Sequence, residues 1–563
     1  MRYADIVSVY ERLEATPSKL EKARIAAAFL RELDRGALHY ATILLTGRVF
    51  PAYDARELGV AEQTMIKAVA RVSGFPTEDV EKRFAKKGDL GLVAEGLLKG
   101  KKQRTLGHGT LTVDRVVGNL QKLPDATGAK SQERKVALVS ELLASASPLE
   151  ARYIVRNVLG DLRVGVAEGI VRDAIVAAFI ETDSKERKGA ANAVEYAWNI
   201  LSDFGEVAEI ARTHGIRGLR GVRPTVGKPI QMMLGIAAEK ISDVTKEHGT
   251  VIAQYKYDGM RVQIHKRGER IWVFTRRLED VTKQFPDIVG LCKSGLRSRE
   301  CIVDGEALGI RNGKPVPFQA LSQRIQRKYD IERMAKEIPV QLNLFDAVYA
   351  DGALLLDKPL AERWDILRGI VRESAGKFQM AEQVLSDDIR TLEKFYKDAL
   401  DAGQEGVFLK VPTSAYVFGR HVGGWYKIKP IMETLDLVIV GATWGEGKRT
   451  RWLSSYVLAC RDPETGRLLE CGMLSTGLTE EQYDEVTRTM KPLIETEKGK
   501  SVTIKPKVVI EAGYQEIQKS PTYSSGYALR FPRLVRVRTD KNVEEVDTLE
   551  RVVALYKSQG RKG

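Results

Sequence analysis

Hydrophobic residues recur at helical spacing through about the first 220 positions of the chain. In the first segment they lie at i, i+3, i+4 and i+7, the period of one helix face, and are Ile6, Val9, Tyr10 and Leu13. A second helix is predicted over 18–35, started by Thr16-Pro17 and ended by Gly36. Further helical patterns cover 61–72, 80–84, 131–143 and 148–158. Because few stretches alternate as strands do, we predict an all-α domain over residues 1–220.

The pattern changes after Gly221 to short apolar, β-branched runs separated by helical segments. Residues 221–230 hold two prolines and two glycines and are predicted to be a linker. Strands are expected at 251–257, 262–265, 271–275, 301–308, 340–349, 406–411 and 425–428. This alternation is typical of an α+β domain on antiparallel sheets, which we predict for residues 221–429.

The last region, residues 430–563, is predicted to be mostly β. Strand-like runs lie at 435–442, 456–460, 468–473, 508–517 and 534–537, with a turn at 462–466. Several short strands within about 110 residues indicate a small barrel. A final helix is predicted over 543–557.

Composition narrows the class of protein. The chain has 563 residues, 43% of them hydrophobic, so two to four globular domains are expected and disorder is not. Its net charge of +14 suits a polyanionic partner, either nucleic acid or an anionic membrane surface, although an ordinary basic protein is the alternative. Four cysteines without a C-x-x-C spacing indicate neither a disulfide framework nor a zinc site. No signal segment or membrane span is evident, so a soluble, cytoplasmic protein is expected.

A single lysine, Lys256, lies between a strand-like run and a glycine turn. An amine held against apolar neighbours and other cations loses part of its proton affinity and can attack phosphorus. Three further segments of the same domain carry charge: Asp304-Gly-Glu306, predicted to end a strand, Glu405 at a strand start, and Lys427 and Lys429 on one face of a strand. Taken singly, each segment is more often a turn or a solvated surface.

Two places in the helical region are candidate DNA contacts. Lys101 and Lys102 lie in a basic loop, and Arg163 and Gly165 precede the helix that runs to Phe179. Glycines beside a helix N-terminus let backbone N–H groups approach a phosphate, and arginine adds charge. The alternative for both is a solvated loop.

The order of these segments resembles the nucleotidyltransferase motifs of ATP-dependent DNA ligases, most of all the replicative ligases of archaea and eukaryotes. The resemblance rests on Lys256-Tyr-Asp-Gly-x-Arg261, Arg276, Asp304-Gly-Glu306, Phe345-Asp346, Glu405-Gly406, Lys427-Ile-Lys429 and Arg530-Phe-Pro-Arg533 to Arg538-Thr-Asp-Lys541. It implies a helical DNA-binding domain over 1–220, an adenylation domain over 221–429 and an OB-fold with a C-terminal helix over 430–563.

The resemblance also implies a role for each residue. Lys256 would attack the α-phosphorus of ATP, and AMP would pass to the 5′-phosphate of a nick before the 3′-hydroxyl displaces it. Lys427 and Lys429 would reach the α-phosphate, while Glu405, Glu306 and Asp258 would hold Mg²⁺, with Mn²⁺ as the alternative. The implied nucleotide contacts are Gln254, Arg261, Arg276, Glu306, Phe345, Arg420, Lys427, Arg530 and Arg533.

Some positions depart from the family pattern. Gln254 stands where the family often has a glutamate that reads the adenine amine, and Arg420 lies seven rather than about six positions before Lys427. The implied partners are nicked duplex DNA and a sliding clamp, yet the clamp segment 103–106 lacks aromatic residues. We expect a monomer, associated with the nucleoid if the source is a prokaryote.

Other functions are open to the same lysine pattern. An RNA ligase and an mRNA-capping guanylyltransferase are the enzyme alternatives, and the long helical region favours a DNA enzyme over both. An NAD-dependent ligase is disfavoured because the cysteine spacing of its zinc module is absent. A non-catalytic protein that encircles DNA is the alternative from another class.

Overall fold

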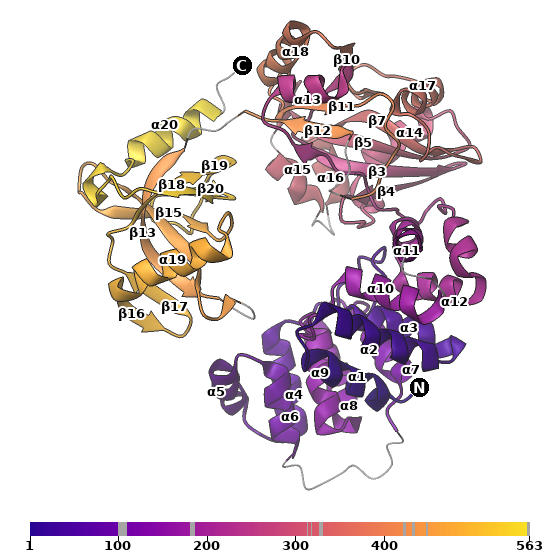
Figure 1. Cartoon of the computed structure of the whole chain (residues 1–563), viewed down its shortest axis with the longest axis vertical. Helices are drawn as coiled ribbons and strands as arrows, with labels where there is room; N and C mark the ends of the chain where they lie inside the picture. Colours follow the sequence, from indigo (N-terminus) through magenta and orange to yellow (C-terminus); the bar gives the residue numbers. More distant parts are fainter. Residues whose placement is uncertain are drawn as a thin grey trace.

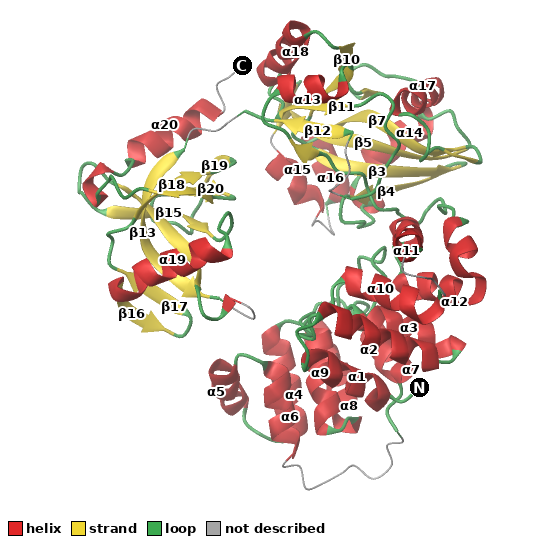
Figure 2. Cartoon of the chain, viewed as in Figure 1, coloured by secondary structure: helices red, strands yellow, loops and turns green. Residues whose placement is uncertain are grey.

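The computed structural model describes residues 1–99, 110–180, 186–311, 313–316, 318–325, 330–419, 424–430, 434–445 and 449–559 (Figure 1). Three parts follow one another along the chain. Up to Arg220 the described secondary structure is essentially helical, the middle part combines sheets with helices, and the last part is mostly β (Figure 2). The three regions expected from the hydrophobic pattern are therefore present.

The helical part buries one face of each helix in a shared core. Its elements are α1 (Tyr3–Glu14), α2 (Lys19–Glu32), α3 (Arg35–Leu45), α4 (Glu62–Ser73), α5 (Thr77–Lys87), α6 (Leu90–Lys99), α7 (Val113–Gln121), α8 (Ser131–Ser145), α9 (Pro148–Val158), α10 (Glu168–Phe179), α11 (Arg187–Leu201) and α12 (Phe204–Arg220). The predicted face of α1 is buried, and α9 begins at Pro148 as predicted, with Ser147 and Glu150 forming a capping box.

The predicted end of the second helix is wrong. The helix stops at Glu32, Leu33 is extended, and Asp34 caps α3 by accepting a hydrogen bond from the Ala37 backbone N–H at 2.8 Å. Gly36 consequently lies in the first turn of α3. An aspartate N-cap two residues earlier outweighs glycine as a boundary signal.

The middle part contains two largely antiparallel sheets. The five-stranded sheet has the order β1 (Ile236–Ala237), β12 (Trp425–Ile428), β11 (Gly406–Lys410), β2 (Val251–Lys256) and β10 (Gln383–Ser386). The seven-stranded sheet has the order β4 (Arg270–Thr275), β3 (Met260–Arg267), β5 (Glu300–Arg311), β7 (Val340–Ala350) and β8 (Ala353–Leu354), with β6 (Lys314–Val316) on β5 and β9 (Phe378–Met380) on β7. Every strand predicted for this region is confirmed.

Helices cover the apolar outer face of each sheet. Apolar side chains of the five-stranded sheet pack with α13 (Ile241–His248) and α18 (Ile389–Asp401). The seven-stranded sheet packs against α14 (Pro286–Gly295), α15 (Phe318–Ile325), α16 (Ile331–Glu337) and α17 (Leu360–Ile370). Because strand side chains alternate, the opposite, inner faces receive the polar residues of each strand.

The segment predicted as a linker has no helix or strand but is hydrogen-bonded to both neighbouring parts. Lys228 pairs with Glu206 of α12 at 2.5 Å. On the other side, the Gly227 N–H donates to His265 and the Ile230 N–H to Gln263, both on β3, at 3.0 and 2.9 Å. These contacts fix the course of the connection over the middle part.

The last part is mostly β. Its strands are β13 (Leu435–Trp444), β14 (Leu453–Arg461), β15 (Leu468–Leu474), β16 (Ile494–Lys498), β17 (Ser501–Ile504), β18 (Val509–Gly513), β19 (Glu516–Lys519), β20 (Tyr527–Arg530) and β21 (Arg533–Val537), with helices α19 (Glu480–Met490) and α20 (Leu549–Gln559). The run 508–517 is two strands rather than one. The final helix begins at Leu549 and not at 543, because Asn542 caps a 3₁₀ turn and Val546 packs in a separate apolar cluster.

Candidate active site

Strand alternation places a row of polar and aromatic side chains on the inner face of the five-stranded sheet. The register pairs Gln254 with Phe408 and Phe408 with Lys427 across β2, β11 and β12. Lys256 and Lys410 lie two positions from these partners, on the same face. The neighbouring residues Ala253, Val407 and Leu409 point the other way, into the apolar cluster under α13 and α18.

The seven-stranded sheet contributes the facing row. Arg261 lies opposite Glu306, and Gln263 lies opposite Asp304, in the pairing of β3 with β5. The prediction that Asp304-Gly-Glu306 ends a strand is wrong, because this segment lies in the middle of β5. Gly305 has a packing reason instead: a Cβ there would lie 2.8 Å from the Leu344 side chain and 3.0 Å from the Asn343 carbonyl oxygen of β7.

Lys256 pairs with Glu405 at the open end of the two rows. Its Nζ donates to a Glu405 oxygen, and Lys429 Nζ lies 2.5 Å from that oxygen. Lys256 Nζ also lies over the ring of Phe408, 5.7 Å from its centroid. Burial opposes ionisation of Glu405, but the two ammonium groups outweigh it and hold the pKa of Glu405 below its usual value. The cluster therefore joins a candidate nucleophile, a carboxylate and a second cation.

Two further carboxyl groups crowd this cluster. Burial raises the pKa of Glu306 to about 8, against the opposing charges of Lys256 and Arg261. Burial, then the charges of Glu405 and Glu516, raise the pKa of Asp258 to about 6. Glu516 belongs to β19, so a strand of the last part lies within electrostatic reach of the cluster.

The same carboxyl groups fit a hard divalent cation. Among the described residues, no group of three or more candidate ligands is arranged to hold a metal ion by itself. Mg²⁺ usually takes one or two carboxylates and completes its shell with phosphate oxygens and water, so a preformed cage is not required. The mutual repulsion of Asp258, Glu306 and Glu405 is what a bound cation would relieve.

Replacing Glu306 with glutamine is expected to stabilise the protein only at high pH. A raised pKa means that the folded state keeps a proton that the unfolded state has lost, so stability falls as pH rises from about 4.5 to about 8. Glutamine removes this dependence. We expect the melting temperatures of Glu306→Gln and wild type to agree at pH 5 and the variant to melt at least about 3 °C higher at pH 8.5. An equal difference at both pH values would contradict the assignment.

Arg261 is held from two sides. It donates to the Met233 carbonyl oxygen at 2.5 Å and to Asp304 at 2.7 Å. Tyr416 donates to the same Asp304 at 2.7 Å and accepts the Met233 N–H at 3.1 Å. Asp304 therefore orients Arg261, a role that the sequence did not indicate because its partners lie more than forty positions away.

Aromatic rings surround the buried side chain of Lys410, which lies farther into the space between the two rows. Lys410 is 1% exposed, and its Nζ lies 3.9 Å from the Trp425 ring centroid and 4.7 Å from that of Phe345. It donates to the side-chain oxygen of Gln254. Lys410 was not among the predicted site residues, although a lysine within an otherwise apolar strand was a signal for it.

The predicted motif residue Asp346 forms a fully buried ion pair with Arg363 of α17. Both side chains are 0% exposed, and the two hydrogen bonds measure 2.8 and 2.9 Å. Arg363 also donates to the Lys358 and Ser414 carbonyl oxygens. The pair fixes the middle of β7, where Phe345 precedes Asp346.

Breaking this pair is expected to cost more stability than breaking an exposed pair on the same helix. Asp346→Asn leaves Arg363 buried without a counter-ion, which typically costs about 3–5 kcal/mol. We expect a clear loss of melting temperature, measured by circular dichroism. Asp365→Asn, which removes the exposed pair of Asp365 with Arg368, is the matched control and is expected to melt like wild type. Equal melting of the two variants would contradict the prediction.

The other predicted nucleotide contacts come from different parts of the chain. Arg276 is exposed just after β4. Arg530 and Arg533 are exposed on β20 and β21 of the last part. Arg420, Lys101, Lys102 and the segment 103–106 lie outside the described residues.

Contacts within the helical part hold the predicted DNA-contact loop around Arg163 and Gly165. Arg163, at φ +59°, lies 2.6 Å from Asp161 and donates to the Gly88 carbonyl oxygen at 3.1 Å. Gly165 has φ +64°, and the buried Lys22 donates to the carbonyl oxygens of Val164 and Gly165. A phosphate contact by Arg163 would have to compete with Asp161, so this role stays a prediction.

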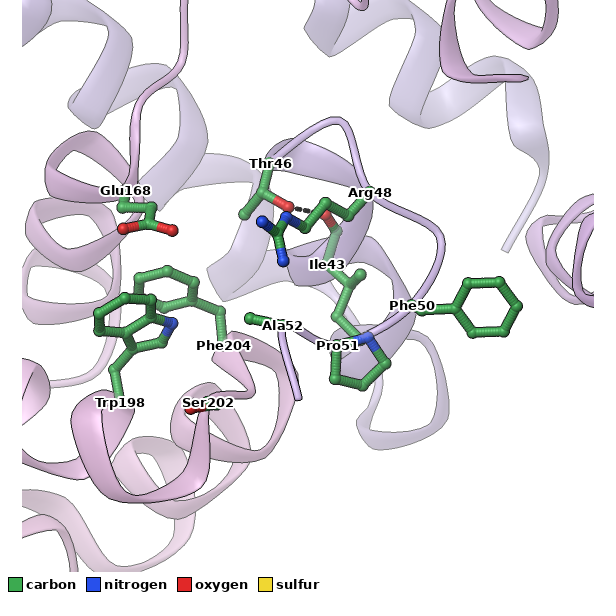
Figure 3. A pocket seen from close by; sticks show the side chains of 10 residues that line it. All are labelled: Ile43, Thr46, Arg48, Phe50, Pro51, Ala52, Glu168, Trp198, Ser202 and Phe204. Carbon is green, nitrogen blue, oxygen red and sulfur yellow. Dashed lines mark hydrogen bonds between the residues drawn. The ribbon is translucent and has the colours of Figure 1, made fainter. Parts of the chain in front are cut away.

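A small pocket in the helical part is unsuited to a nucleotide. It lies between the stacked rings of Trp198 and Phe204 and the segment around Arg48 (Figure 3). Its volume of about 20 Å³ suits about one water molecule.

Within the described part of the chain, no helix combines the length and apolar character needed to cross a membrane.

Comparison with known proteins gives the family. Three family models match in chain order: "DNA ligase N terminus" over residues 2–176, "ATP dependent DNA ligase domain" over 232–429 and "ATP dependent DNA ligase C terminal region" over 449–541. A DNA ligase of Archaeoglobus fulgidus is 44% identical over 560 residues, covering 99% of each chain. A DNA ligase of Thermococcus onnurineus is 44% identical over 563 residues, covering 100% of this chain and 99% of its own.

Solved structures agree on the fold. One titled Pmar-Lig_Pre covers 95% of this chain and 99% of its own, with a TM-score of 0.59 at 17% identity. Together with the relatives, this confirms the resemblance found in the motifs and the three-part architecture of a helical N-terminal domain, a central adenylation domain and a mostly β C-terminal region. The chain therefore belongs to the family of ATP-dependent DNA ligases.

Proposed function

We propose that the chain seals nicks in duplex DNA through a covalent AMP on Lys256. The observation that carries this proposal is the cluster of Lys256, Glu405 and Lys429 between two inner sheet faces. A nucleotidyl transfer needs an aligned nucleophile and positive charge on the phosphate oxygens, and little other chemistry from the protein. The cluster offers both.

In the first step, the ammonium group of Lys256 gives a proton to water, and the resulting amine attacks the α-phosphorus of ATP. A phosphorus–nitrogen bond forms, the bond to the pyrophosphate oxygen breaks, and the nitrogen, positively charged after the attack, releases a second proton to water. Lys429 and Lys427 supply charge to the α-phosphate oxygens, and Glu405 accepts a hydrogen bond that orients the amine. Mg²⁺, when bound near Glu405, Glu306 and Asp258, would neutralise phosphate charge.

In the second and third steps, AMP moves from Lys256 to the 5′-phosphate of the nick, and the 3′-hydroxyl then displaces AMP. The first transfer reforms the lysine amine, and the second joins the strands and releases AMP. Arg261, fixed by Asp304 and the Met233 carbonyl oxygen, is suited to contact the ribose, with Glu306 opposite it. Phe345 is suited to stack on the adenine.

We assign the domains as proposed from the sequence: DNA binding to residues 1–220, adenylation to 221–429, and an OB-fold with the C-terminal helix to 430–563. Arg163, Gly165, Lys101 and Lys102 are proposed DNA contacts. A monomer that acts at the nucleoid in the cytoplasm, and that binds a sliding clamp, is the proposed cellular state. Gel filtration tests the monomeric state, because the chain is then expected to elute at the volume of a single copy.

A pulse-chase experiment tests the proposed function. The full chain is incubated with Mg²⁺ and α-labelled ATP, GTP or NAD, freed of nucleotide, and given nicked DNA. We expect protein label from ATP that survives denaturation at neutral pH, moves to the nick and is lost as the nick closes. Label from GTP alone would favour a capping enzyme, transfer only to nicked RNA would favour an RNA ligase, and no label would overturn the enzyme mechanism.

Nick binding is expected to weaken steeply with salt. A protein of net charge +14 that contacts several phosphates displaces counterions from the duplex. We expect the dissociation constant to rise at least about 100-fold between 50 and 200 mM salt, measured by fluorescence anisotropy with a labelled nick. Affinity that is nearly flat over this range would contradict the prediction.

A further inference from the structure

Lys410 is a buried cation that donates to an uncharged amide. It donates to the side-chain oxygen of Gln254, and rings of Trp425, Phe345 and Phe408 surround its Nζ at 3.9, 4.7 and 5.9 Å. Gln254 is 2% exposed and lies two positions before Lys256, on the same strand face. Lys410 therefore lies at the end of the site away from the cluster of Lys256, Glu405 and Lys429.

The nearby carboxylates are occupied by other donors. Asp304 accepts hydrogen bonds from Arg261 and Tyr416, and Asp346 accepts hydrogen bonds from two of the three side-chain nitrogens of Arg363. Two buried cations, Arg363 and Lys410, and the largely buried Arg261 therefore face two buried carboxylates. Lys410 is the cation left without a carboxylate of its own, because position 254 is glutamine.

The contact with Lys410 determines how the Gln254 amide is turned. An ammonium group only donates, so the side-chain oxygen of Gln254 must face it. The amide nitrogen then points away and donates to Gln383 on β10 at 3.2 Å, which leaves its second N–H for another partner. While Lys410 is charged, Gln254 presents a donor and not an acceptor.

We propose that Lys410 is a positioning residue that determines which purine this site accepts, by holding the oxygen of Gln254 and turning its amide N–H toward the base. The proposal rests on the proposed function, which stacks the base on Phe345, and on the expectation that Gln254 contacts the same base. A donor at Gln254 pairs with the ring nitrogen of adenine or with the oxygen of a 6-oxopurine. The 6-amino group of adenine needs an acceptor, which Gln254 offers only when its amide turns over.

The charge of Lys410 changes within the physiological range. Burial lowers the pKa of Lys410 to about 7; Asp346 on β7 and Asp304 on β5 oppose this shift, while Arg261 on β3 and Arg363 on α17 add to it. Above that pH the neutral amine no longer requires the Gln254 oxygen, so the amide is free to turn its oxygen to the base. The preference for ATP over inosine triphosphate, a 6-oxopurine nucleotide, is therefore expected to rise with pH.

The experiment measures Lys256 labelling by α-labelled ATP and, separately, inosine triphosphate from pH 6 to pH 8. The ratio of the two kcat/KM values cancels the titration of Lys256 and of the phosphates. In wild type we expect this ratio to rise at least about fivefold over the range. In Lys410→Met the ratio is expected to be high and flat, since the amide turns freely, and in Lys410→Arg low and flat, since the charge is permanent. Gln254→Glu, which cannot donate, is expected to prefer ATP at every pH.

Lys266→Met is the matched control, because Lys266 is a second buried lysine of this domain that donates instead to the Leu296 carbonyl oxygen. Its ratio is expected to follow wild type. A flat ratio in wild type, or a Lys410→Met ratio that follows wild type, would overturn the proposal. If Lys410→Arg does not fold, the wild-type and Gln254→Glu profiles decide. Absence of label from either nucleotide in wild type would overturn the proposed function together with this inference.

Discussion

Replacing Lys256 with alanine is expected to abolish covalent labelling by ATP, with a loss of at least about four orders of magnitude. Lys256 is the proposed nucleophile of the Lys256, Glu405 and Lys429 cluster. Lys429, whose Nζ lies 2.5 Å from the same Glu405 oxygen, is proposed to supply charge to the α-phosphate. Nick sealing with ATP is expected to fail equally. Initial rates of label incorporation into the denatured protein give the measurement.

Two variants separate loss of the nucleophile from loss of charge or fold. Lys256→Arg keeps the positive charge beside Glu405 but is not expected to form a stable adduct. Lys246→Ala removes an exposed lysine of α13 and is expected to label like wild type. Labelling of Lys256→Ala at the wild-type rate would rule out Lys256 as the nucleophile.

Removing Arg530 and Arg533 together is expected to slow self-adenylation at least about 100-fold, because each guanidinium would stabilise charge on the leaving pyrophosphate. Both lie in the last part of the chain, on β20 and β21. Arg530 pairs in register with Glu516, whose charge acts on Asp258 in the active site. The hairpin is therefore already near, and a limited domain closure would bring the arginines to ATP.

A neighbouring arginine provides the control for this prediction. Arg536→Ala removes an exposed residue of the same strand that pairs with Glu511 at 2.6 Å, and it is expected to self-adenylate within about twofold of wild type. Deleting residues 431–563 is expected to match or exceed the loss of the double variant. Undiminished labelling in either the double variant or the truncated chain would refute the role of domain closure in the first step.

The sequence predicted those features that depend on local periodicity. The patterns in 251–257, 406–411 and 425–428 predicted the three strands, which the structure confirms. The pairing of these strands then places Gln254, Lys256 and Lys427 on one inner face, which the sequence did not predict. The ordered motifs gave the family. Neither the local periodicity nor the order of the motifs requires knowledge of which strands lie side by side.

Features that depend on distant partners were not predictable from these patterns. Lys410 meets Gln254 across 156 positions, and Tyr416 meets Asp304 across 112, so neither contact has a local signal. The Asp304-Gly-Glu306 segment looked like a turn because glycine between carboxylates usually is one. In the structure the glycine instead admits the side chain of Leu344. The helix expected from 543 failed for a similar reason, since tertiary packing of Val546 competes with the helical pattern.

The most direct test of a covalent lysine intermediate is peptide mapping of the protein after reaction with ATP and Mg²⁺. Proteolysis at neutral pH followed by mass spectrometry is expected to find one AMP per chain, on the peptide that contains Lys256, and to find none after chase with nicked DNA. An AMP on another lysine, or an active enzyme with no adduct, would contradict this mechanism.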